Sequence, residues 1–204
     1  GYLGLYTRGH GEGLTERMRI SPSGEIGIGV VPEVWDVANN FHALQVGTGA
    51  SFAGSGSANT NSQAYMGNNC YFDDVDNRWE YIGQSEAQLM QMNDDGHLYY
   101  YTAPAGGSDD AAITFTNRLT ILNNGNTGIG TATPGRTLTV NGSSDTYIGY
   151  EFGEAEKWLV GIEASGTKYV IHDFGGTAGN RLVLDNNSRI SLSNNDSGTS
   201  NTIF

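Results

Sequence analysis

The residues best equipped for chemistry in this sequence are carboxylates that gather in short polar runs. The densest run is Asp73-Asp74-Val75-Asp76-Asn77, and oxygen-rich sets of this kind can hold a hard cation such as Ca²⁺. An EF-hand loop needs acidic ligands at fixed alternate positions and a closing Glu, and neither is present. We therefore predict a turn there, and also at Asp94-Asp95-Gly96 and Ser108-Asp109-Asp110.

Other catalytic signatures are missing from the chain. The four histidines are scattered, never at i, i+4 spacing or beside the single cysteine, so the sequence predicts no zinc site. No Gly-x-Ser-x-Gly elbow stands out, and a glycosidase pair is defined by a separation in space that one sequence does not give. We predict a protein that is not an enzyme, with no catalytic, cofactor-binding or metal-binding residues and no cofactor. The histidines are His10, His42, His97 and His172.

A glycine-rich run from Gly24 to Gly29 loosely mimics a dinucleotide-binding loop. Such a loop must follow a strand and open a helix, but Val30-Val31-Pro32 follows here and the run recurs further along the chain. These glycines are therefore assigned a structural role.

Aromatic side chains could serve as stacking platforms for sugars. In an alternating strand Tyr99 and Tyr101 share a face that Tyr100 does not. Because aromatic residues dominate β-sheet cores, we expect most of them to be structural, and the sequence singles out no ligand-binding residue. The candidates are Trp35, Trp79, Trp158 and Tyr99-Tyr100-Tyr101.

Net charge and composition limit the classes of molecule that this protein is expected to bind. The formal net charge is −12 at pH 7, which disfavours nucleic acid and anionic membranes as partners. Cys70 is the single cysteine, so no intrachain disulfide forms; we expect it to be a small buried hydrophobe in a protein folded in a reducing cytosol. We find no membrane span and no signal peptide, and we expect the chain, which begins at Gly1 and stops at Phe204, to be a piece of a longer polypeptide.

One unit recurs three times without a gap, at Glu16–Gly29, Asn117–Gly130 and Asn180–Ser193. In each copy apolar residues alternate with polar ones, a turn follows, and the alternation resumes, which predicts a hairpin with one apolar face. Gly24 and Gly125 stand where the turn needs positive φ.

Small residues occupy the other face of the returning strand, as at Gly27 and Gly29 around Ile28, and at Ser191 and Ser193 around Leu192. We therefore expect another strand or chain to pack closely against this face.

The rest of the chain also favours β structure, with polar hairpin loops at residues 73–77 and 93–96 and a turn at 164–167. Glu33–Asn40 predicts one helical turn, and Gly47–Ser62 is either a long loop or a weakly apolar strand pair. The expected strands are Tyr65–Phe72, Trp79–Ile82, Leu89–Met92, His97–Thr102, Ala111–Thr116, Thr146–Phe152, Trp158–Glu163 and Lys168–His172.

Apolar residues are spread thinly, and no stretch is apolar enough for a central core strand, so we expect no closed monomeric domain. Three copies wound around an axis would bury the apolar stripes, each buried Ile contributing roughly 1.5–3 kcal/mol. We predict an all-β, elongated homotrimeric fibre of short β-hairpins and interleaved sheets, like a β-prism or triple β-helix. Its modules would be residues 1–31, 32–134 and 135–204.

The ordered set of motifs supports the same expectation. It comprises Arg17-Met18-Arg19-Ile20…Ser23-Gly24…Gly27-Ile28-Gly29, its second copy from Leu119 to Pro134, Ala43–Gly47, Asn69…Tyr71 with Trp79…Ile82, Gly96–Pro104, Ala112–Phe115, and Trp158…Ile162 with Arg181-Leu182. This set resembles the tail fibres of marine and other bacteriophages. The resemblance implies an elongated homotrimer in the virion tail, made in the host cytoplasm, that contacts other tail or baseplate proteins and a host surface glycan or outer-membrane protein.

Two other functions stay open at this point: a tail-associated depolymerase that cuts capsular or lipopolysaccharide chains, and a bacterial surface adhesin or extracellular filament. For the trimer, Ile28→Asp, Ile129→Asp and Leu192→Asp should each prevent assembly, because each would bury an unpaired charge. Gly29→Val should be worse than an ordinary surface change.

Overall fold

The computed structural model describes all residues except 58–59, 153–154, 164–165, 175–177, 188 and 193–204. The described chain consists of strands, turns and a single 3-10 turn, which confirms the predicted all-β class. It divides into two compact units, Gly1–Thr139 and Val140–Phe204. The finer division of the chain into three modules at residues 31 and 134 stays a prediction.

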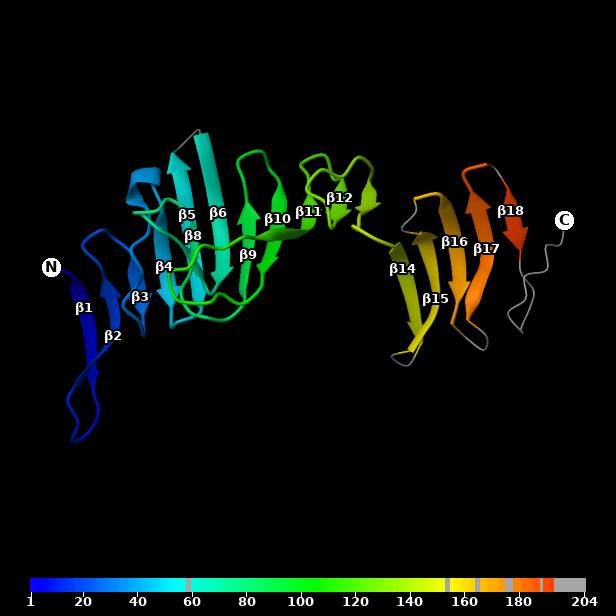
Figure 1. Ribbon diagram of the computed structural model, residues 1–204. Helices are drawn as coiled ribbons and strands as arrows, with labels where there is room; N and C mark the ends of the chain where they lie inside the picture. Colours follow the sequence, from blue (N-terminus) through cyan, green and yellow to red (C-terminus); the bar gives the residue numbers. More distant parts are fainter. Residues whose placement is uncertain (58–59, 153–154, 164–165, 175–177, 188, 193–204) are drawn as a thin grey trace. The chain divides into compact units, whose positions relative to one another are not determined.

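The described part of the first unit is built on one large sheet whose strand order nearly follows the chain (Figure 1). Pairings from β1 to β12 are antiparallel except β3–β4, which is parallel and is connected through the 3-10 turn η1. The order is β1 (Leu3–Arg8), β2 (Leu14–Ile20), β3 (Ile26–Ile28), β4 (His42–Val46), β5 (Ala50–Ser57), β6 (Thr60–Asn68), β9 (Ala87–Met92), β10 (Leu98–Ala103), β11 (Thr116–Ile121), β12 (Thr127–Ile129) and β13 (Leu138–Val140), with η1 at Val37–Asn39.

Most predicted elements of this unit are confirmed. The helical turn expected within Glu33–Asn40 is η1, and the two acidic loops lie in the predicted hairpins. Of the two alternatives for Gly47–Ser62, the strand pair is correct, since β5 and β6 pair antiparallel.

A separate hairpin, β7 (Cys70–Phe72) with β8 (Trp79–Tyr81), covers one face of the large sheet. Ser51 Oγ in β5 donates to the Cys70 carbonyl at 3.0 Å, and Cys70 Sγ lies 3.5 Å from the Gln88 carbonyl of β9. The hairpin therefore lies across the middle of the sheet and gives this unit a core on one face.

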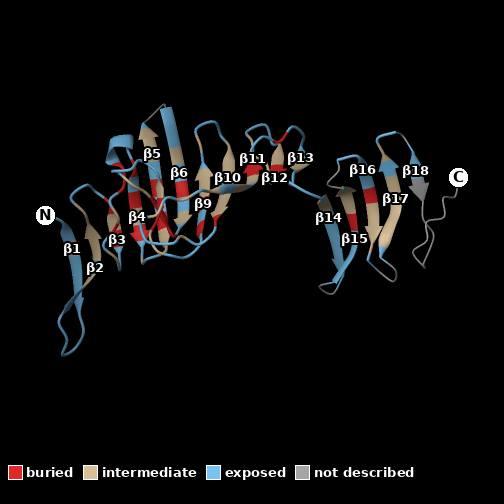
Figure 2. Cartoon of the chain, in the orientation of Figure 1, coloured by how far each residue is buried: buried red, intermediate tan, exposed pale blue. Residues whose placement is uncertain are grey.

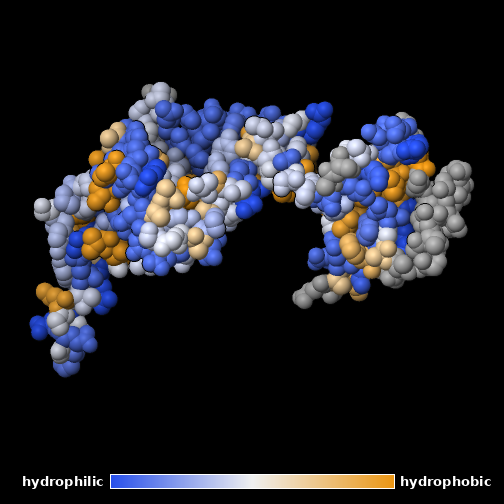
Figure 3. Space-filling model, in the orientation of Figure 1, coloured by the Kyte–Doolittle hydropathy of each residue, from blue (hydrophilic) through white to orange (hydrophobic). Residues whose placement is uncertain are grey.

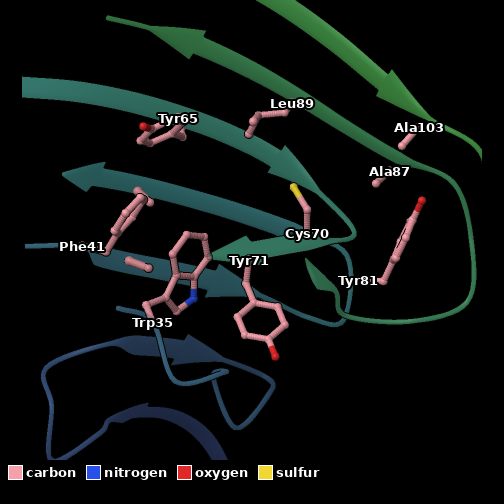
Figure 4. Packing of buried hydrophobic residues seen from close by; sticks show 11 residues of the cluster. Trp35, Phe41, Tyr65, Cys70, Tyr71, Tyr81, Ala87, Leu89 and Ala103 are labelled. Carbon is pink, nitrogen blue, oxygen red and sulfur yellow. The ribbon is translucent and has the colours of Figure 1, made fainter. Parts of the chain in front are cut away.

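The core between hairpin and sheet is aromatic (Figure 4). Trp35 is fully buried, with its ring centroid 6.0 Å from that of Phe41 and 6.1 Å from that of Trp79. The first unit therefore has a buried core of its own, although its apolar residues are spread thinly along the sequence. Sequence reasoning missed this core because its members come from strands and loops scattered along the chain, each contributing one or two residues.

The second unit is a smaller antiparallel meander. Leu159 and Val170 are buried, although most of its described residues are half-buried or exposed (Figure 2). The predicted turn at 164–167 falls partly outside the described residues. Its strands are β14 (Thr146–Phe152), β15 (Ala155–Ile162), β16 (Lys168–Asp173), β17 (Gly179–Asp185) and β18 (Ile190–Leu192).

Candidate functional site

The hairpin units predicted from the repeat are present and share one register. Met18 pairs with Ile28 in β2–β3, Leu119 with Ile129 in β11–β12, and Leu182 with Leu192 in β17–β18. Gly24 and Gly125 adopt φ values of 104° and 85°, as the turns require. The three copies are thus one structural element used three times.

The apolar side of the first two hairpins, β2–β3 and β11–β12, continues across the large sheet. Ile28 pairs with Val46, and Leu44 with Phe52. Further along, Phe52 pairs with Met66, and Met66 with Met90. Because paired residues point to the same side of a sheet, these side chains form one surface. We call it the apolar face: Met18, Ile20, Ile26, Ile28, Leu44, Val46, Phe52, Met66, Met90, Met92, Leu98, Leu119, Ile121 and Ile129.

This face is the side that the β7–β8 hairpin leaves uncovered. Ile28 is 41% exposed, Met66 47% and Ile129 48%, and a shallow hollow of about 560 Å³ opens over Phe52 and Met66. Figure 3 shows apolar side chains reaching the surface near β2–β4. A contiguous apolar area of this extent on a protein surface marks a contact with another surface.

The second unit repeats the pattern on its own sheet. Ile148 pairs with Val160 and Val160 with Ile171, while Leu184 pairs with Ile190. Ile148 and Ile190 are exposed. The side chain of Leu192, predicted to lie in a trimer core, falls outside the described residues.

The small residues opposite the apolar face have two separate explanations. A Cβ on Gly27 would lie 2.3 Å from the Val30 carbonyl oxygen, and one on Gly128 would lie 2.6 Å from that of Thr131. The predicted close packing is therefore present, but the segment that follows in the same chain makes it. Gly29 was wrongly assigned to this packing: open space surrounds it, and its φ of 69° explains the glycine.

Each repeat also carries a basic residue whose role the register reveals. Leu5 and Tyr6 pair with Met18 and Glu16, so Arg17 is the extra residue of a β-bulge. Equivalent register shifts leave Arg118, Arg181 and Lys157 unopposed in their strands. Arg17 Nε donates to Thr7 Oγ1 at 2.7 Å, and Arg118 Nε to Thr102 Oγ1 at 2.8 Å.

The acidic run is a turn, as predicted. One carboxylate oxygen each from Asp73, Asp76 and Glu80 lies within 4.8 Å of the others. Asp73 Oδ2 accepts from the backbone N–H groups of Val75 and Asp76, and the Arg78 guanidinium bridges Asp76 and Glu80. The arginine already supplies the positive charge that a cation would bring.

The other acidic runs are turns as well. Gly96 has a φ of 77°, and Asp110 has one of 61°. Asp110 Oδ1 accepts from the Tyr71 hydroxyl, and burial, followed by hydrogen bonds to Glu80 and Asp110, raises the pKa of that tyrosine.

The aromatic candidates divide between buried and accessible positions. Trp35 is fully buried and Trp79 packs in the same core, so Trp35 cannot stack on a sugar. Tyr99 and Tyr101 share a face, with ring centroids 5.8 Å apart, as predicted. Trp158 in the second unit is 42% exposed.

Cys70, His97 and His172 contact other residues of the chain and are structural. Burial raises the pKa of the Cys70 thiol to about 12, which keeps it protonated and unreactive. His97 Nδ1 lies 2.9 Å from the Tyr99 hydroxyl, and His172 Nδ1 lies 2.8 Å from Asn180 Oδ1.

The described residues contain no helix whose length and apolar character would let it cross a bilayer. Comparison with known protein families and with characterised proteins found no match for this chain.

Proposed function

We propose that this chain is a segment of a homotrimeric β-fibre in a bacteriophage tail, where it contributes to attachment to the host cell. The apolar face is the observation that supports this proposal most directly. An apolar surface that spans nine strands needs a cover, and copies of the same chain arranged around an axis provide one.

The residues of the apolar face favour copies of the same chain, over a different protein, as the partner that covers it. Its residues repeat at the same hairpin register, so identical chains would place like residues at the same level along the axis. Each Ile that leaves water contributes roughly 1.5–3 kcal/mol, and a trimer gains this three times per level before ordering costs are subtracted. The net charge of −12 per chain would keep the assembled fibre soluble.

The proposed role is mechanical reach combined with weak, multivalent contact to a host surface glycan or outer-membrane protein. The order of the motifs and their likeness to tail fibres support the attachment role. The other tail or baseplate proteins would hold the fibre at the virion.

Light scattering of the purified protein tests the assembly. We expect a solution mass of three chains, and Ile28→Asp or Ile129→Asp should reduce it, because three unpaired charges would meet at one level. Val75→Asp, a change at a fully solvated loop position, is the matched control and should leave the trimer intact. A monomer, or a dimer that closes face to face, would overturn the trimer.

Attachment is tested with fluorescently labelled protein on intact cells of a bacterial panel that includes marine isolates. We expect binding to one or a few strains, lost in the Ile129→Asp variant because avidity needs three chains. Release of sugar from purified envelope by the unlabelled protein would instead favour the depolymerase function.

A further inference from the structure

A second surface feature lies on the other side of the large sheet. It is a cavity of about 430 Å³ formed by η1, the adjoining ends of β5 and β6, and the loop of the β7–β8 hairpin. This volume is in the range of ligand sites in proteins, about 300–1,000 Å³. No sequence motif pointed to it, because its residues come from four separate segments.

The lining of this cavity is uncharged. In a chain with 22 acidic residues, none of the described residues that line it carries a formal charge. Side-chain amides and hydroxyls provide the polar groups, and each of these both donates and accepts hydrogen bonds. The amides are those of Asn39, Asn40, Asn61, Gln63 and Asn77.

Aromatic rings form the apolar part of the cavity. Phe41 and Phe72 stack with centroids 4.6 Å apart and an interplanar angle of 8°, and Tyr65 lies 5.6 Å from Phe41. Phe41 and Tyr65 are buried, whereas Phe72 is only half-buried. The rings are held by the core behind them, as the positions of Phe41 and Tyr65 in Figure 4 show.

The polar groups are fixed before any ligand arrives. Asn39 Nδ2 donates to Asp36 Oδ2 and, at 3.1 Å, to Asn77 Oδ1. Gln63 Oε1 accepts from the Tyr65 hydroxyl and from Gln91 Nε2, while no described residue accepts from Gln63 Nε2. A site that is ordered in advance loses less entropy on binding.

We propose that this cavity binds an uncharged saccharide, such as a short segment of a neutral surface polysaccharide. Sugar hydroxyls donate and accept together, which matches amides and hydroxyls, and the C–H face of a pyranose ring matches the half-buried ring of Phe72. None of the described lining residues is charged, and the nearby carboxylates of Asp36 and Asp94, which accept hydrogen bonds from Asn39 and Asn61, favour an uncharged sugar over an anionic one.

The inference rests on the proposed function and gives the attachment role a ligand class. Ser55 pairs with Gln63, and Tyr65 lies two residues after Gln63 on the same strand, so these three side chains point to the same side of the sheet. This is the side that the β7–β8 hairpin covers, because Tyr65 belongs to the core between hairpin and sheet. The cavity therefore lies on the face opposite the apolar face and stays open when the apolar face is covered. Three weak sites per fibre would act together through avidity.

The test uses the assembled protein on an array of neutral oligosaccharides built from glucose, galactose, mannose, rhamnose and N-acetylhexosamines, with counterparts that carry uronic or sialic acid. Asn40→Gly and Asn77→Gly remove amides while keeping backbones whose φ values, 58° and 53°, glycine accepts. Asn124→Gly, at an exposed turn outside the cavity, is the matched control.

We expect binding to one or more neutral oligosaccharides, weakened about tenfold by each cavity variant and unchanged in Asn124→Gly, because a lost hydrogen bond of about 1.4 kcal/mol corresponds to a tenfold change in affinity. Solution mass is measured on every variant. Preference for acidic sugars, no binding to any neutral one, or binding that the cavity variants do not change would overturn this inference. If the solution mass is that of a trimer, such a result overturns only the saccharide site. A monomeric mass would contradict the proposed fibre as well.

Discussion

Asn69, which lies between β6 and β7, binds through its side chain the segment that joins β8 to β9. Its Nδ2 donates to the carbonyls of Gly83, Ser85 and Glu86, and its Oδ1 accepts from Gly83 N–H at 2.7 Å. The residue is buried and has a φ of 56°, a conformation that asparagine tolerates better than most residues.

Asn69→Ala should therefore lower the free energy of unfolding by about 3 kcal/mol, since several buried polar groups lose their partner. Urea unfolding followed by tryptophan fluorescence measures this, because Trp35 and Trp79 lie in the same core. Asn68→Ala, at the exposed neighbouring amide, should cost less than about 1 kcal/mol. Equal losses in the two variants would contradict the role assigned to Asn69.

The buried thiol of Cys70 gives a second prediction at this scale. Because burial raises its pKa from 9.0 to about 12, the folded protein should not react with an aromatic disulfide reagent at pH 8, and should react fully in concentrated urea. The raised pKa also stabilises the fold below pH 9, and this contribution is lost as the pH rises from 9 towards 12. Rapid labelling of the folded protein would show that Cys70 is accessible.

At the scale of elements, the bulge residue of the hairpin unit carries the main prediction. Lys157 occupies in β15 the place that Arg118 occupies in β11, so Arg118→Lys should change the free energy of unfolding by less than about 1 kcal/mol. Deleting Arg118 should cost about 1 kcal/mol or more, because it removes the hydrogen bond from Arg118 Nε to Thr102 Oγ1 and the bend that the bulge gives β11, although Asn117 and Leu119 keep their partners Tyr101 and Tyr100.

Thermal unfolding of the two Arg118 variants provides the measurement. The deletion should lower the melting temperature clearly more than the Lys substitution does. A deletion that is tolerated as well as the substitution would mean that the bulge and its arginine do not stabilise β11.

The hairpin units were the most predictable elements because every signal in them is local. Alternation at Leu119 and Ile121, the turn glycine Gly125 and the returning Ile129 lie within about a dozen residues, and the register follows from them. The continuation of the apolar face from one strand to the next through Phe52 and Met66 was not predictable, since it depends on which strands pair. Gly29 was misinterpreted because sequence does not separate a glycine needed for its φ from one needed for its size.

At the scale of the molecule, the two faces of the large sheet differ in what they can contact. One side is the apolar face, open in the single chain, and the other carries the aromatic core and the uncharged cavity. Under the proposed function, one surface would serve assembly and the opposite one would bind a ligand. The sequence alone predicted the part of the first that the hairpin repeats form, and contained no local signal for the second.

If copies of the chain cover the apolar face, stability must depend on protein concentration. Binding to a partner copy stabilises the folded state by mass action, so the melting temperature should rise by several degrees between about 1 and 100 μM for a reversible trimer. Differential scanning calorimetry at four concentrations measures this. The Ile129→Asp variant should melt lower and show no such dependence, because a charge at that level prevents association. Val75→Asp should follow the wild type. A melting temperature that stays constant in the wild type, together with the mass of a single chain, would show that the apolar face is not an interface between copies.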